Sequence, residues 1–310
     1  MKKIVDISKI LLISLIILSL VFISGQEGCA PTDPNAGKTG IDFSLISRTD
    51  TLTSGKTIQP GETFFIGVRV NNYDQKERQI KLCIKDSVLD QYGGIPTEGN
   101  CQEVSIPAAE RVKKESSGLM GSSSSQQIEP GTKDVYFPEQ GQYTYTGLPK
   151  MNPPFSSSVS VNIRYLETND ATTTVYVPVS EQPPIVQEPS QIMVSMQKSI
   201  YSQGDAYRVN LELTFTKNPS SKIFLQDFLE ENENKTFFSA KLAGKPLECK
   251  TTNNQPVGNV LEIKDQKTIR CSTLLYQGAQ RQDYDFVTTM IYGVELSRDY
   301  SFSIDTSQIM

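Results

Sequence analysis

The strongest constraint on the fold is a strictly alternating stretch at residues 60–72, Pro-Gly-Glu-Thr-Phe-Phe-Ile-Gly-Val-Arg-Val-Asn-Asn. Its apolar side chains recur at every second position, at Phe64, Ile66, Val68 and Val70. Only an extended chain, whose side chains alternate between two faces, places these four residues together. We therefore predict a β-strand that is buried on one face against a core.

The alternating pattern returns at residues 203–215, where Tyr, Val, Leu and Leu occupy the corresponding positions. A second match relates residues 159–177 to residues 286–304, in which a Tyr and several apolar residues fall at the same offsets. Two separate matches indicate two copies of one β-module.

Composition supports an all-β protein and excludes several kinds of chemistry. A chain of 310 residues with 37% hydrophobic and 21% charged residues has room for two cores. Short alternating runs punctuated by Gly, Pro and Asn are typical of strands and turns. The formal net charge of -5 argues against a nucleic-acid-binding surface. The sequence has no His, which removes Ser-His and Cys-His relays and imidazole-ligated metals.

The N-terminus has the pattern of an export signal. A basic start at residues 1–3 precedes an apolar run at residues 10–23. This run is shorter than the about 20 residues that a membrane-spanning helix needs, so it favours a secretory signal peptide. An uncleaved hydrophobic anchor helix is the alternative. We assign residues 1–28 to the signal peptide or anchor and residues 29–40 to a tether.

Cys29 follows the signal as a single cysteine and is a candidate lipid anchor. Gly28 fits the position before a lipidated cysteine, whereas Glu27 and Gln26 depart from the lipoprotein pattern. The alternatives are a free thiol at Cys29 and an uncleaved anchor.

The other four cysteines predict two disulfides. Cys83 and Cys101 each lie out of phase with the apolar positions of a predicted strand, so we expect a bridge on the surface. Cys249 and Cys271 lie in phase with neighbouring apolar residues, so we expect this pair nearer the core. Disulfides of this kind form in an oxidising compartment, and closing the Cys83–Cys101 loop stabilises the fold by about 3 kcal/mol in the chain-entropy model.

We predict a first domain over residues 41–180. Its Ser- and Gly-rich segment 108–132 has little to bury and is expected to be a mobile loop. The domain is expected to end in a hairpin, with a first strand at 156–165, a turn at 167–170 and a return to residue 179. A Pro-rich linker at 181–191 then leads to a second domain over 192–310.

Two motifs in the second domain are candidate functional sites. One is an acidic cluster, for which we weigh a calcium site against a solvated turn or short helix. The cluster lacks the regular Asp-x-Asp-x-Asp-Gly order, which favours the solvated segment. Its members are Asp227, Glu230, Glu231 and Glu233. The other is Asn234-Lys235-Thr236, an N-glycosylation sequon that makes Asn234 a candidate glycan carrier. No metal or other cofactor is predicted.

Three features carry a resemblance to a known group of proteins: the hydrophobic signal, the strand that ends at Val68–Asn72, and the segments 165–168 and 292–294. With these, the chain resembles archaeal exported, membrane-anchored surface proteins with tandem immunoglobulin-like β-sandwich domains. The resemblance implies an all-β fold of two tandem Ig-like antiparallel sandwiches. It also implies an outward-facing location at the cell membrane.

We therefore predict that the protein is not an enzyme but a membrane-tethered cell-surface protein with a structural, adhesion or envelope-interaction role. The sequence has no glycine-rich phosphate loop, no Cys-x-x-Cys and no nucleophile elbow. The expected partners are the membrane, through the N-terminus, and other envelope proteins or glycans, but no nucleic acid. The alternative is a lipid-anchored solute-binding protein or hydrolase with a site between the two modules. Paired carboxylates and a Ser-Lys dyad stay open, because only their geometry identifies them.

Overall fold

The computed structural model describes residues 35, 38–118, 121–149, 154–179, 181–276 and 282–307. They belong to two compact units, which are considered separately: a larger one with residues 39–109 and 130–307, and a smaller one with residues 35, 38 and 110–129. The predicted signal or anchor at 1–28 and the candidate lipid anchor Cys29 lie outside the described residues. No helix within the described ranges combines the length and the hydrophobicity that a membrane span requires.

The all-β fold class is confirmed. Antiparallel strands dominate both units, and the helical elements among the described residues are two short 3-10 turns, η1 (Asp90–Tyr92) and η2 (Glu230–Asn232).

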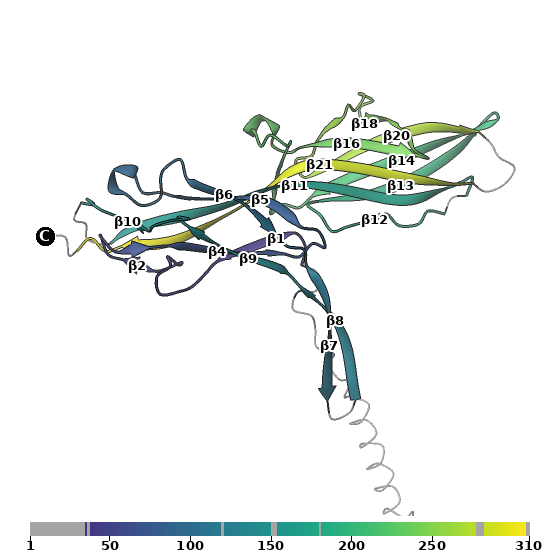
Figure 1. Ribbon diagram of the computed structural model, residues 1–310. Coiled ribbons are helices and arrows are strands. Elements are labelled where there is room, and N and C mark those ends of the chain that lie inside the picture. The colour runs from purple at the N-terminus through teal and green to yellow at the C-terminus, as the bar shows by residue number, and fades with distance from the viewer. Residues whose placement is uncertain are drawn as a thin grey trace, which may run out of the picture. The chain divides into compact units, whose positions relative to one another are not determined.

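Two strands of 23 residues each, β11 (Phe155–Val177) and β21 (Gln282–Ile304), form the central antiparallel pair of the larger unit (Figure 1). Their register runs without interruption from Phe155 opposite Ile304 to Val177 opposite Gln282. Every second side chain of β11 from Ser157 to Val177 is buried. One face of this strand is therefore covered along the whole length of the pair.

In the first half of the larger unit, a three-stranded sheet shares a hydrophobic core with the long pair. This sheet has the order β1-β4-β9 and consists of β1 (Ile41–Leu45), β4 (Ile66–Asn72) and β9 (Gly131–Phe137). The long pair is extended on the β11 side by β5 (Arg78–Asp86) and β6 (Asn100–Ile106). Short strands complete this half: β2 (Thr57–Ile58), β3 (Thr63–Phe64) and β10 (Tyr143–Thr144). The strand predicted from the alternating stretch is confirmed, because all four of its apolar side chains are fully buried.

In the second half, a four-stranded sheet of order β13-β14-β20-β18 contributes to the same core. It consists of β13 (Ile192–Gln203), β14 (Ala206–Lys217), β20 (Gln266–Tyr276) and β18 (Glu248–Thr251). The long pair is extended here on the β21 side by β16 (Lys235–Leu242). The smaller strands are β12 (Val186–Gln187), β15 (Lys222–Phe224), β17 (Lys245–Pro246) and β19 (Val260–Glu262).

The C-terminal end of β21 packs in the first half of the unit. The ring of Tyr145 stacks on Phe64, at 5.2 Å between centroids, and on Phe302 of β21, at 6.0 Å. Arg298 of β21 also pairs with Asp42 of β1, with 2.6 Å between Nη2 and Oδ1. Residues that the sequence assigned to a second domain therefore complete the core of the first.

The division into domains 41–180 and 192–310 does not separate two compact units, because β11 and β21 run through both halves. The hairpin expected within residues 156–179 is wrong for a related reason. Glu167 to Asp170 are polar residues typical of a turn, yet β11 continues through them. Glu167 and Asn169 keep to the inward-facing alternation and are 5% and 3% exposed.

The second sequence match has a structural counterpart in the pairing of β11 with β21. The match aligns Tyr165 with Tyr292. The residues that follow these two tyrosines, Leu166 and Gly293, lie opposite each other in the sheet. The matched segments are therefore antiparallel partners related by a local two-fold axis through this pair. The match reflects two equivalent long strands, not two separate hairpins.

A buried polar cluster occupies the middle of the long pair, where Glu167 lies opposite Tyr292. Burial raises the pKa of Glu167 to about 7, against the opposing charge of Arg78. Arg78 is itself held by Asp74, at 2.7 Å between Nη2 and Oδ2, and lies over the ring of Tyr165. The centre of the sheet thus contains an acidic group whose burial disfavours its charged form, so that it takes up a proton at a higher pH than an exposed carboxyl.

The smaller unit contains a two-stranded antiparallel hairpin, β7 (Glu110–Gly118) and β8 (Gly121–Glu129), in which Gly118 lies opposite Gly121. The segment 108–132, expected to be a loop, therefore contains a hairpin. Sequence reasoning missed these strands because their Ser-rich residues show no apolar alternation, whereas backbone hydrogen bonds between two strands do not require it.

Candidate functional site

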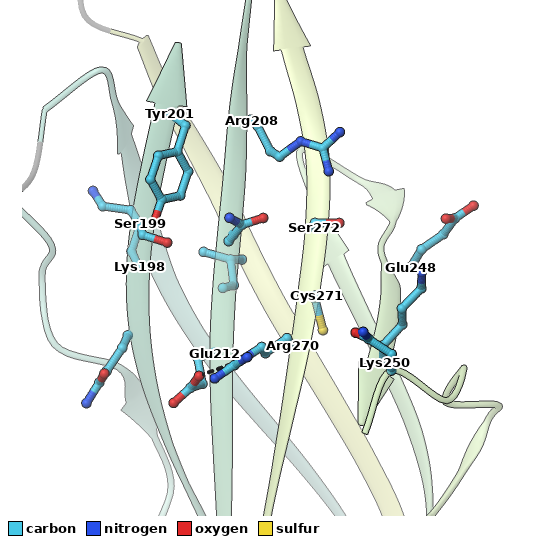
Figure 2. Close-up of a pocket in the computed structure, with 14 residues that line it drawn as sticks. Lys198, Ser199, Tyr201, Arg208, Glu212, Glu248, Lys250, Arg270, Cys271 and Ser272 are labelled. Carbon is cyan, nitrogen blue, oxygen red and sulfur yellow. Dashed lines mark hydrogen bonds and ion pairs between the residues drawn. The ribbon is translucent and has the colours of Figure 1, made fainter. Parts of the chain in front are cut away.

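The strongest candidate for a binding site is a groove of about 710 Å³ on the outward face of the sheet β13-β14-β20-β18 (Figure 2). The opposite face of this sheet is apolar and is buried through Val209, Leu211, Leu213 and Phe215 of β14. Because side chains alternate along each strand, the intervening residues project away from the core. They are mostly polar.

The strand register arranges these outward residues in three parallel rows. The first row is Gln197, Glu212, Arg270 and Lys250. The second row is Ser199, Asn210, Ser272 and Glu248. The third row is Tyr201, Arg208 and Leu274. Each row runs across the strands. Neighbouring strands lie about 4.8 Å apart, so a row that crosses all four strands is roughly 14 Å long.

The groove is formed by the difference in side-chain length between the second row and the two rows beside it. Three short side chains of the second row, Ser199, Asn210 and Ser272, form its floor, and the longer side chains of the two flanking rows form its walls. The floor runs from the edge strand β13 toward the other edge strand, β18, where Glu248 follows.

An ion pair fixes part of one wall. Arg270 Nε lies 2.8 Å from Glu212 Oε2, and Figure 2 shows these two side chains meeting across neighbouring strands. In the other wall, Arg208 Nε donates to Gln203 Oε1 at 3.0 Å. The ring of Tyr201 is 58% exposed. The walls therefore combine guanidinium, carboxylate and amide groups with one accessible aromatic face.

A second depression, of about 560 Å³, lies where the Pro183-Pro184 segment runs beside β13. The titratable residue in its lining is Lys198, whose Nζ donates to the carbonyl oxygens of Tyr176, Val179 and Glu181 at 3.0, 3.0 and 2.6 Å. These contacts anchor the Pro-rich segment to β13, which is a structural role for this lysine.

The structure confirms both predicted disulfides. Cys83 pairs with Cys101 between β5 and β6, and Cys101 is exposed, as expected for a surface bridge. Cys249 pairs with Cys271 between β18 and β20, and these residues are 6% and 0% exposed, as expected for a bridge near the core. The second bridge lies directly beneath the groove, because Cys271 lies between Arg270 and Ser272 in the strand.

Removal of the Cys249–Cys271 bridge is expected to destabilise the protein more than removal of the Cys83–Cys101 bridge. Closing either loop stabilises by about 3 kcal/mol in the chain-entropy model, but replacing the buried Cys271 also leaves a cavity. Urea unfolding of the two double Cys→Ala variants measures the difference. Equal losses would show that burial of the second bridge adds nothing.

The structure does not bring the other predicted site residues, Asn234 and the acidic cluster, together in one site. Asn234 is half-buried, has a φ of 63° and accepts a hydrogen bond on Oδ1 from Lys217 Nζ at 2.8 Å. Its glycosylation stays a prediction. Within the acidic cluster, Glu230 and Glu231 begin the short 3-10 turn η2 and are exposed. No group of three or more acidic, Cys or His side chains placed to hold a metal occurs among the described residues.

The comparisons with known proteins define no family. No family model and no curated protein match the chain. Among similar solved structures, envelope protein VP37 from White Spot Syndrome Virus has a TM-score of 0.22 and 6% identity, covering 41% of this chain and 97% of that one. Red sea bream transglutaminase has a TM-score of 0.21 and 7% identity, and the match covers 86% of this chain but 31% of that one. Both TM-scores lie far under 0.5, so the function proposed below rests on neither.

Sequence reasoning missed the groove. Its residues come from four strands over residues 197–272, and their outward positions read as ordinary solvent-facing ones. One signal was available: Arg208, Asn210 and Glu212 alternate with apolar residues of β14. By contrast, six of the eleven outward residues of β11 from Ser156 to Tyr176 are the smaller Ser or Thr.

Proposed function

We propose that the protein is an exported, non-catalytic binding protein, held at the outer side of the cell membrane by its N-terminus, that contacts envelope partners through the groove. The single observation that carries this proposal is the groove itself. Its small floor residues and long polar walls lie on a sheet whose other face is buried, so the core fixes the strands that carry them.

Two further features support a location outside the cytoplasm. The two disulfides are typical of proteins that mature in an oxidising compartment. The basic and apolar N-terminus is typical of an export signal.

The alternative was a solute-binding protein or hydrolase with a site between two modules. The depression at Pro183-Pro184 is the nearest counterpart of such a site. Its lysine is occupied by three backbone carbonyls, so the lining supplies no group arranged for general acid or base catalysis. The groove supports binding better.

Binding of the full-length protein in detergent to isolated cell envelopes tests the proposal. Ser272→Trp fills the floor of the groove at an exposed position, so we expect binding to weaken by about tenfold or more. Thr216→Trp is the matched control, because Thr216 is also exposed on the outward face of this sheet but lies outside the groove. Equal binding by both variants would contradict a role for the groove.

A further inference from the structure

We infer that the groove binds a neutral oligosaccharide. This inference rests on the proposed function and specifies the ligand class. It depends on three properties of the lining: the balance of its charges, its mixture of hydrogen-bond donors and acceptors, and its single exposed aromatic ring.

The charges that the groove presents nearly cancel. Four cationic and two acidic residues line it: Lys198, Arg208, Lys250, Arg270, Glu212 and Glu248. The ammonium of Lys198 is held by three backbone carbonyl oxygens, and the charge of Arg270 is taken up by its ion pair with Glu212. Arg208 and Lys250 then remain against Glu248, which leaves one positive charge. A polyanion would require a surplus of Lys and Arg along the groove. The lining instead suits a ligand without net charge.

The floor and walls offer both donors and acceptors. Asn210 presents an amide, Ser199 and Ser272 present hydroxyls, and Glu248 presents carboxylate oxygens. A sugar hydroxyl also donates and accepts, and neighbouring hydroxyls match the paired groups of amide, guanidinium and carboxylate side chains. A protein partner would instead be expected to find apolar or aromatic anchors in a desolvated centre. The small polar floor lacks that character.

Tyr201 supplies an apolar surface at one side of the groove. Its ring lies in the row that includes Arg208 and is 58% exposed (Figure 2). A phenol combines a flat apolar face with a polar tip, which suits the C–H face of a sugar ring surrounded by hydroxyls. The floor crosses the sheet from one edge strand toward the other, so an extended chain of sugars can lie along it.

The test uses full-length protein in detergent with both disulfides intact. The probes are immobilised neutral oligosaccharides of glucose, mannose and galactose, with heparin and single-stranded DNA as anionic probes. We expect binding to at least one neutral probe, little change between low and high salt, and no release of reducing sugar. Tyr201→Ala and Ser272→Trp should each weaken this binding by about tenfold or more, whereas Thr216→Trp should leave it unchanged.

Three results would overturn the inference: binding only to anionic probes with a steep salt dependence, neutral binding that Ser272→Trp does not weaken, or no neutral binding. If no neutral probe binds while Ser272→Trp still abolishes attachment to isolated envelopes, the ligand class is wrong and the proposed function stands. If envelope attachment is also insensitive to Ser272→Trp, both fail.

Discussion

Phe286→Ala is expected to lower the free energy of unfolding by about 3–5 kcal/mol, the usual loss for removing a buried aromatic ring. Phe286 is fully buried in β21 and lies opposite Thr173 of β11 and Leu242 of β16. Because β21 continues into the first half of the unit, the loss should destabilise both halves together. Amide hydrogen exchange in β4 and β14 measures this, since β4 belongs to the first half and β14 to the second.

The matched control is Tyr276→Ala, which removes an aromatic ring that is 88% exposed and should cost far less. If β14 lost protection in Phe286→Ala while β4 kept it, the two halves would unfold separately. The shared long pair would then not couple them.

Glu167→Gln is expected to raise stability above pH 7 by about 3 kcal/mol. The ordinary pKa of this carboxyl is 4.5, and burial raises it to about 7 in the folded protein. As the pH rises between these values, the unfolded chain releases the proton first. The free energy of unfolding of the parent protein therefore falls over this range and levels off above it. Glutamine keeps the shape of the side chain without the charge.

Chemical unfolding of both proteins at a series of pH values measures this difference. The two curves should agree below about pH 4.5 and separate up to about pH 7. Glu98→Gln is the control, because it removes a carboxyl that is exposed in the folded protein. If the free energy of unfolding of Glu167→Gln and of the parent changed with pH in the same way, ionisation of Glu167 would cost the folded protein no stability.

The sequence predicted those strands whose inward residues are apolar, and it failed where they are polar. Phe64 to Val70 could be read directly, because burial of apolar residues on one face requires the alternation. Residues 167–170 were read as a turn because composition alone does not reveal that Glu167 and Asn169 are buried. That misreading divided one long strand into a hairpin. The Pro-rich segment 181–191 and the two sequence matches then placed a domain boundary inside one compact unit.

The disulfides could be predicted because their signal is local in the sequence, whereas the groove could not because it depends on strand pairing. The phase of each cysteine relative to its neighbours indicates whether it faces the core, so Cys101 and Cys271 could be distinguished before the structure was known. The groove depends on which strands are neighbours and in what register. Ser199 and Ser272 meet on one floor only through the pairings of β14 with β13 and β20, and no local pattern indicates these pairings.

Labelling of intact cells with an amine-reactive reagent that does not cross membranes, followed by mass spectrometry, tests the central claim most directly. A folded binding protein outside the cell membrane should be modified at Lys250, which is exposed in the groove. Its Cys83–Cys101 and Cys249–Cys271 bridges should be found oxidised. Modification only after lysis, with all four of these thiols reduced, would contradict the account.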